Sequence, residues 1–152
     1  MPEPLVDFDR LVSQMPLPLF AAPMFIVSNP DLVVAQCTSG IIGSFPALNA
    51  REPDLLDKWL KEIASRNSEA SNNGNFVAPF AVNLIVHRNN VRLDEDLTTV
   101  IQHRVPIVIT SVGKPGNIAE AVHSYGGLIF HDVTNVRHAR KALESGVDGL
   151  IL

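Results

Sequence analysis

The chain has 152 residues, of which 46% are apolar and 18% are charged. That length suits one domain, and that composition excludes an intrinsically disordered chain. The 12 basic and 16 acidic residues give a net charge of -4, which argues against nucleic-acid binding. The sequence has no apolar run long enough to span a membrane and no secretion-signal pattern, and its single cysteine, Cys37, excludes an intrachain disulfide. We therefore expect a soluble, cytoplasmic protein.

Short apolar runs alternate with amphipathic stretches in the first half of the sequence, a pattern typical of βαβ units around a parallel sheet. Pro30 follows Asn29 at the expected start of one helix, and Gly40 is expected to end it. The polar segment 65–75 is expected to be a surface loop. The predicted elements of this half are strands at 19–24 and 41–44, a helix from Pro30 to about Ser39, and a helix after Pro53 that carries Leu56, Trp59, Leu60 and Ile63 on one face.

The same alternation continues in the second half of the sequence. The helix that follows the fifth strand is expected to carry Val136, Ala139 and Leu143 as its apolar residues. The predicted elements are a strand at 77–86 bent at Pro79, a helix over Leu93–Ile101, a strand at 106–112, a helix after Pro115, a strand at 128–131, a helix that ends at Gly146, and a strand that begins at Val147.

This order of elements predicts an α/β fold. The sequence holds about five and a half βα units in 152 residues. This number of residues per unit matches a (β/α)8 TIM barrel, which takes about 250 residues. The interpretation we favour is that residues 1–152 are the N-terminal portion of a single barrel domain, truncated inside its sixth strand. A complete flavodoxin-like sheet of about five strands is the alternative. A truncated barrel would leave sheet edges open, so we expect poor folding in isolation or rescue by a homodimer.

In both architectures, ligands bind at the carboxyl ends of the strands. The segment 22–24, Ala22-Pro23-Met24, is either a strand end and turn or a flat surface for an aromatic ring beside a soft methionine. Asn83 lies within an apolar strand, so its amide needs hydrogen-bond partners from the protein or from a ligand. Ser111, at the end of the fourth strand, is either a turn residue or a donor to a ligand.

His131 and Asp132 form the most suggestive pair, at the end of the fifth strand. A histidine there can donate, accept or titrate near neutral pH. Asp132 is either part of the site or the cap of the following helix. The other histidines lack the spacing of metal ligands, and Cys37 is expected to be a buried, inert thiol, so we predict no metal site.

Five ordered runs of residues carry a resemblance to a known family. The runs are PLFAAPM, SNPDLVVA, IIGSFPALN, FAVNLIVH and the long run that begins PIVITSVGKPG and ends at Leu152. Their order and spacing are similar to those of the nitronate monooxygenase (2-nitropropane dioxygenase-like) family, over residues 17–152. Members of that family are FMN-dependent TIM barrels, so the resemblance implies this fold and this cofactor.

The resemblance also implies roles for the matching residues. Ala22, Pro23 and Met24 would line the isoalloxazine ring of FMN, Asn83 and Ile85 would lie beside the flavin, and Ser111 would face the cavity.

At the top of the fifth strand, the resemblance implies that His131 is the catalytic candidate and that Asp132 contacts the cofactor. Some relatives carry a lysine in place of Asp132, and an acid there would repel the FMN phosphate or a reduced flavin anion. The family's usual catalytic histidine and the phosphate-binding loops of the barrel would lie beyond Leu152.

The implied activity is the oxidation of alkyl nitronates to carbonyl compounds and nitrite, with electrons passed through FMN to O2. The implied partners are small molecules, with neither a nucleic acid nor a membrane, and a homodimer is compatible with the sequence. Two alternatives stay open: an NADH:quinone reductase on the same scaffold, and a catalytically inactive half-barrel.

Overall fold

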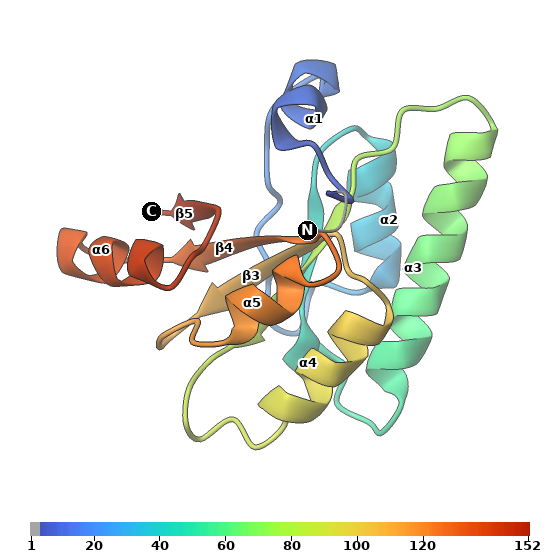
Figure 1. Cartoon of the computed structure of the whole chain (residues 1–152). Helices are drawn as coiled ribbons and strands as arrows, with labels where there is room; N and C mark the ends of the chain where they lie inside the picture. The colour runs from blue at the N-terminus through green and yellow to red at the C-terminus, as the bar shows by residue number, and fades with distance from the viewer. Residues whose placement is uncertain (1–3) are drawn as a thin grey trace. The chain divides into compact units, whose positions relative to one another are not determined.

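A computed structural model of the protein describes residues 4–152, in which helices and strands alternate along the chain (Figure 1). The elements are α1 (Phe8–Gln14), α2 (Pro30–Thr38), β1 (Gly43–Pro46), the short 3-10 helix η1 (Ala47–Asn49), α3 (Leu55–Asn72), β2 (Phe80–Ile85), α4 (Leu93–Gln102), β3 (Ile107–Ser111), α5 (Ile118–His123), β4 (Leu128–Asp132), α6 (Val136–Glu144) and β5 (Gly149–Ile151).

The strands pair in chain order, β1-β2-β3-β4-β5, in one sheet. The chain divides into two compact units. The N-terminal unit runs from Asp7 to Val82, and the C-terminal unit runs from Asn83 to Leu152 and includes residues 4–6. The boundary falls inside β2, so this strand contributes residues to both units.

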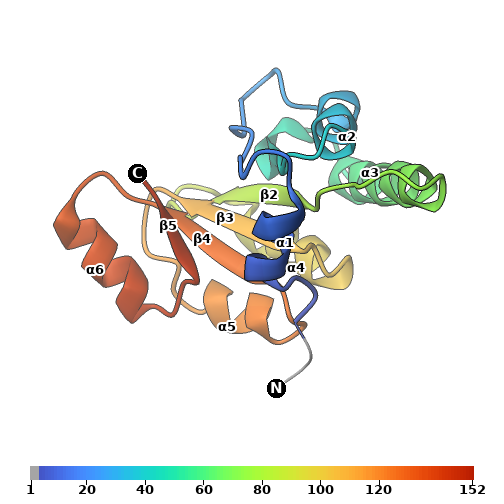
Figure 2. The same ribbon diagram turned by 90° about the horizontal axis from the view of Figure 1, so that it is seen from above.

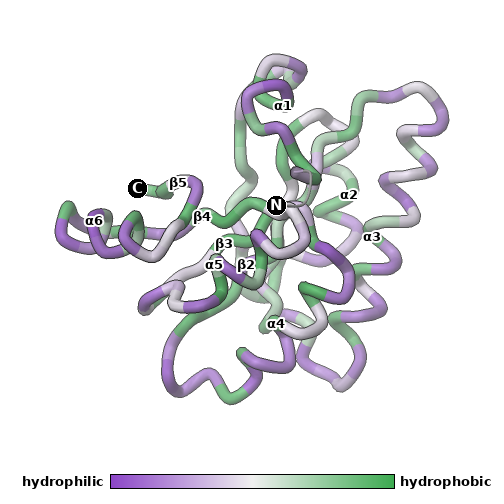
Figure 3. Tube along the Cα trace, viewed as in Figure 1, coloured by the Kyte–Doolittle hydropathy of each residue, from purple (hydrophilic) through white to green (hydrophobic). Residues whose placement is uncertain are grey.

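In the C-terminal unit, β3, β4 and β5 are parallel, with Thr110 opposite His131 and Asp132 opposite Ile151. Helix α5 packs against β4, and α6 packs against β5 (Figure 2). Every residue of β3 is buried, as expected for a parallel strand with both faces covered. Figure 3 shows that the strands and the last helix differ in hydropathy. The trace is apolar along β3 and β4 and mostly hydrophilic along α6.

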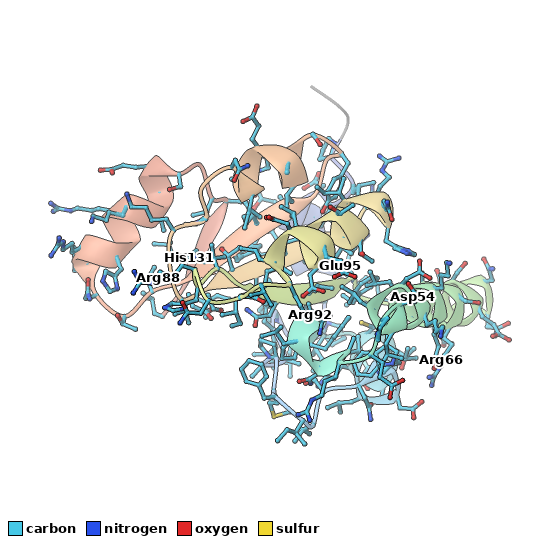
Figure 4. The ribbon with its side chains drawn as sticks, turned by 90° about the horizontal axis from the view of Figure 1, so that it is seen from below. Asp54, Arg66, Arg88, Arg92, Glu95 and His131 are labelled. Carbon is cyan, nitrogen blue, oxygen red and sulfur yellow. The ribbon has the colours of Figure 1, made fainter. Side chains whose placement is uncertain are left out.

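In the N-terminal unit, α2 packs against α3 and β1. The Asn29 side chain accepts a hydrogen bond from the Leu32 amide and caps α2, as its place before Pro30 predicts. The expected apolar stripe of α3 is buried at Leu56, Leu60 and Ile63. Arg66, labelled in Figure 4, joins the two helices because its guanidinium pairs with Asp31 of α2 and Glu62 of α3.

Several of the predicted strands differ from the observed ones. The strand expected at 77–86 is observed as β2 only from Phe80 to Ile85, and the strand expected to begin at Val147 begins at Gly149. The run 19–24 forms only one bridge, between Phe20 and Ile42, because Pro23 has no amide proton and the chain turns after Met24. The strand expected at 41–44 begins two residues later, as β1.

The prediction of a surface loop at 65–75 is wrong for most of that segment. Helix α3 continues to Asn72. Arg66 and Glu62 lie one helical turn apart, and their ion pair stabilises this part of the helix. The serines and asparagines that suggested a loop lie on a mostly exposed helix surface, where their low helix propensity is a small cost. Gly74, with a φ of +86°, lies just beyond the end of the helix.

The apolar face predicted for α6 is also wrong. Val136 and Leu143 are exposed, and the buried residue of this helix is Ala142. Hydrophobic periodicity did not single out the buried Ala142, because the pattern was carried by the larger apolar side chains Val136 and Leu143. None of the helices in residues 4–152 has the length and apolar character of a membrane span.

Candidate functional site

The carboxyl ends of β2, β3 and β4 in the C-terminal unit are joined by side-chain hydrogen bonds. The buried Asn83 amide donates to the Ile109 carbonyl at 3.1 Å and to the Ser111 hydroxyl oxygen at 2.7 Å. The Ser111 hydroxyl in turn donates to a carboxylate oxygen of Asp132. A hydrogen-bonded polar chain of this kind holds its members in one arrangement. We call it the Asn83–Ser111–Asp132 chain.

His131 lies beside this chain and is held by the neighbouring strand. Its Nδ1 is 2.8 Å from the Thr110 hydroxyl, which also lies 3.2 Å from the Phe130 carbonyl oxygen. Both Thr110 and His131 are buried. Since the Thr110 hydroxyl is hydrogen-bonded to Nδ1, Thr110 does not occupy the other ring nitrogen, Nε2.

The environment of His131 favours the neutral imidazole. Burial lowers the pKa of His131 below its ordinary value, and this effect exceeds the opposing influence of the negative charge on Asp132 and of the Gly113 and Thr110 carbonyl groups. A neutral imidazole can accept a proton or a hydrogen bond, which a cationic imidazolium cannot do.

A pocket of about 520 Å³ opens at this end of the C-terminal unit. Its size falls within the range of small-molecule sites. Ser111, His131 and Asp132 contribute the polar groups described above. The remaining lining residues come from the loop after β3 and from α6 and the loop before it, and they are Val112, Gly113, Lys114, Pro115, Thr134, His138, Lys141 and Ala142.

The loop after β3 has an unusual backbone at the pocket. Val112 has a φ of 58°, which is an outlier for a β-branched residue. Gly113 follows with a φ of 138°, and a Cβ atom there would lie 2.3 Å from the Val86 carbonyl oxygen. Only glycine fits that approach, so the turn that brings Lys114 to the pocket depends on Gly113.

The segment Ala22-Pro23-Met24 belongs to the N-terminal unit. The Met24 amide donates to the Ser28 hydroxyl at 3.0 Å, and the Met24 carbonyl accepts from the Asn49 side chain at 3.0 Å. The backbone of Met24 is therefore already bonded, whereas its side chain is exposed. Any contact of Met24 with a ligand would be made by the thioether.

The structure joins Asn83, Ser111 and Asp132 directly and places His131 in the same pocket lining as Ser111 and Asp132. Ile85 is half-buried, and its carbonyl accepts a hydrogen bond from Asn90. The interpretation of Asp132 as a helix cap is wrong, because the Asn135 side chain caps α6.

Sequence reasoning missed four polar residues of the pocket. These are Lys114, Thr134, His138 and Lys141. Lys114 offered a signal, because it lies three residues after the end of β3, whereas Thr134, His138 and Lys141 carry no local pattern that marks a pocket residue.

Cys37 is buried, and burial raises the pKa of its thiol, as expected for an inert cysteine. Within residues 4–152, no group of three or more His, Cys, Asp or Glu side chains is arranged to hold a metal ion.

Comparison with known proteins places the fold. No family model matches the sequence. FabK from Thermotoga maritima superposes with a TM-score of 0.77 and 22% identity, over 93% of this chain and 42% of that chain. A nitroalkane oxidase from Streptomyces ansochromogenes gives a TM-score of 0.77 and 21% identity, over 92% of this chain and 47% of that chain. The chain thus spans less than half the length of these structures.

The fold class follows from these findings and the strand order. The strands pair in chain order, as in a barrel, and not in the order 2-1-3-4-5 of the flavodoxin-like alternative. The chain forms part of a (β/α)8 TIM barrel, and the prediction of this fold is confirmed. In that fold the carboxyl ends of the strands carry the active site, which is where the Asn83–Ser111–Asp132 chain lies.

The donors and acceptors at the strand ends fit a flavin in part. Both amide protons of Asn83 are used within the protein, so its side-chain oxygen is the atom left for a ligand. Asp132 brings a negative charge that disfavours a reduced flavin, but Lys114 and Lys141 line the same pocket and offset it. These residues suit one wall of a ring-binding site and offer no dedicated phosphate cradle.

Proposed function

We propose that this chain supplies one wall of the flavin site in an FMN-dependent oxidoreductase of the nitronate monooxygenase type that works in the cytoplasm. The observation that carries the proposal is the Asn83–Ser111–Asp132 chain at the carboxyl ends of TIM-barrel strands. Its members lie on three successive strands, β2, β3 and β4, where this fold binds ligands.

The first role we propose for these residues is to bind the flavin ring. Asn83, Ile85, Ser111 and Asp132, all in the C-terminal unit, would position the ring. FMN would supply the electron-accepting chemistry that no side chain here offers.

His131 is our candidate for the catalytic residue of this chain. In its neutral form it would accept a proton or a hydrogen bond from the substrate at Nε2, while Thr110 holds Nδ1. Lys114 and Lys141 would favour an anionic substrate such as an alkyl nitronate, because both residues line the same pocket.

An FMN titration of the purified chain tests the proposal. We expect saturable quenching of flavin fluorescence at micromolar FMN. Asn83→Ala should weaken binding by about tenfold, because it removes the amide that fixes Ser111. Asn72→Ala, at the end of α3, is the matched control and should leave binding unchanged.

The outcome of the titration decides which activity is worth measuring. Binding followed by nitrite release from an alkyl nitronate would support the nitronate monooxygenase type. Rapid bleaching of the bound flavin by NADH would instead favour an NADH:quinone reductase. The absence of saturable binding would contradict a flavin wall in this chain and favour an inactive half-barrel.

A further inference from the structure

The hydrogen-bond partner of a histidine ring decides which ring nitrogen carries the proton when the imidazole is neutral. Two histidines outside the pocket have partners that act in one direction only. The Asp148 carboxylate lies 2.9 Å from Nε2 of His123 and can only accept, so Nε2 of His123 is protonated. Nδ1 of His87 accepts from the Asn89 backbone amide at 3.2 Å, which again leaves the proton on Nε2.

His131 differs from these two because its partner is a hydroxyl, which can donate or accept. The Thr110 hydroxyl lies 2.8 Å from Nδ1 of His131 and donates to the Phe130 carbonyl oxygen at 3.2 Å. A hydroxyl has one proton, so a hydroxyl that donates to Phe130 can only accept from His131. The proton of the neutral ring is then on Nδ1, and Nε2 carries the lone pair.

The setting of this pair favours that arrangement over its rival. Thr110 and His131 are opposite each other in β3 and β4, and Thr110 is 0% exposed, so water does not compete for its hydroxyl. In the rival arrangement, the Gly113 carbonyl near the ring would accept from a protonated Nε2, and Thr110 would donate to Nδ1. That would cost the bond from Thr110 to Phe130, which lies inside the sheet.

We propose that Thr110 is a positioning residue that holds His131 in the Nδ1–H tautomer, so that Nε2 carries the lone pair. The tautomer is a property of the flavin-free chain, whereas its use in proton transfer rests on the proposed function. In that use, a proton that leaves the substrate would form the Nε2–H bond, and the substrate would keep the electron pair. The hydrogen bond from Nδ1 to Thr110 would stay in place, so the ring would not have to turn.

The test is a proton–nitrogen NMR correlation spectrum of the imidazole rings in the flavin-free chain, at a pH well above 6.5, the ordinary pKa of histidine. The nitrogen shifts separate protonated from unprotonated ring nitrogens, and couplings to the ring protons tell Nδ1 from Nε2. The chain has five histidines, and the signals lost in His131→Asn belong to His131. We expect a protonated Nδ1 for His131 and, as an internal reference, a protonated Nε2 for His123.

Variants at Thr110 show whether its hydroxyl is responsible. Thr110→Val keeps the branched shape but would leave Nδ1–H beside a methyl group, so we expect the two nitrogen shifts of His131 to exchange. Thr110→Ser keeps a hydroxyl and should keep the Nδ1–H tautomer. Thr98→Val is the matched control, because the exposed Thr98 hydroxyl donates to the Asp94 carbonyl at 2.7 Å. A merely structural role for Thr110 would change stability without exchanging the nitrogen shifts.

Two results would overturn the proposal. One is a protonated Nε2 on His131 in the unaltered chain, which would show that Thr110 donates to the ring. The other is an Nδ1–H tautomer that persists in Thr110→Val, which would show that another acceptor, such as the Thr110 carbonyl near the ring, holds the proton. The first result needs no variant, so the proposal stays testable even if Thr110→Val does not fold. Failure of the FMN titration would leave the tautomer measurement intact, because it is made without flavin.

Discussion

At the scale of single residues, His131 is the group whose protonation the fold controls most clearly. Burial lowers its pKa in the folded protein, so the unfolded chain binds the proton at higher pH than the folded chain does. The stability linked to the neutral imidazole is therefore fully present above the ordinary value of 6.5 and is lost as the pH falls through the lowered pKa. We expect urea midpoints to fall with pH in this window, and to fall less in His131→Asn. An equal fall in both proteins would contradict a buried neutral His131.

Ser111 is the residue that links Asn83 to Asp132, and its hydroxyl both accepts and donates. Ser111→Ala would leave buried polar groups without their partner, so we expect a loss of about 1–3 kcal/mol in the free energy of unfolding. Ser124→Ala is the matched control, since the Ser124 hydroxyl is exposed and donates only to the Ala121 carbonyl. Urea unfolding of the two variants should separate them, and equal losses would show that the chain adds no stability.

At the scale of secondary-structure elements, two leucines show how burial decides the effect of one substitution. Leu60 of α3 is 1% exposed, whereas Leu143 of α6 is 55% exposed. We expect Leu60→Ala to cost about 2–5 kcal/mol through cavity formation. Leu143→Ala should change stability by about 0.5 kcal/mol or less. Thermal and urea unfolding would check both predictions. A large loss of stability in Leu143→Ala would show that Leu143 is buried in solution, as the hydrophobic periodicity of the sequence predicted.

The same two helices show what the sequence could and could not predict. The stripe of Leu56, Leu60 and Ile63 predicted the buried face of α3, because large apolar residues recur there with the helical period. The end of α3 and the face of α6 were missed, since the ion pair of Arg66 with Asp31 of α2 and the burial of Ala142 are tertiary effects. In the candidate site, strand ends indicated Ser111 and His131. Lys141 was missed because its position on α6 shows no local pattern that marks a pocket residue.

At the scale of the whole molecule, the shared strand β2 decides how the two units respond to denaturant. Residues Phe80–Val82 belong to the N-terminal unit, and the rest of the strand belongs to the C-terminal unit. Loss of either unit would remove backbone partners from β2, so we expect one cooperative transition for both units.

Each unit carries its own spectroscopic probe for this prediction. Trp59, the chain's single tryptophan, lies edge-on to Phe45 in the N-terminal unit, and the ring protons of His131 report on the C-terminal unit. Both probes should give the same urea midpoint, and Leu60→Ala in the N-terminal unit should lower both midpoints together. A midpoint for His131 that does not move with Leu60→Ala would show that the C-terminal unit holds its structure alone. In that case the pocket lined by Ser111, His131 and Asp132, which lies wholly within that unit, would persist after the N-terminal unit has unfolded.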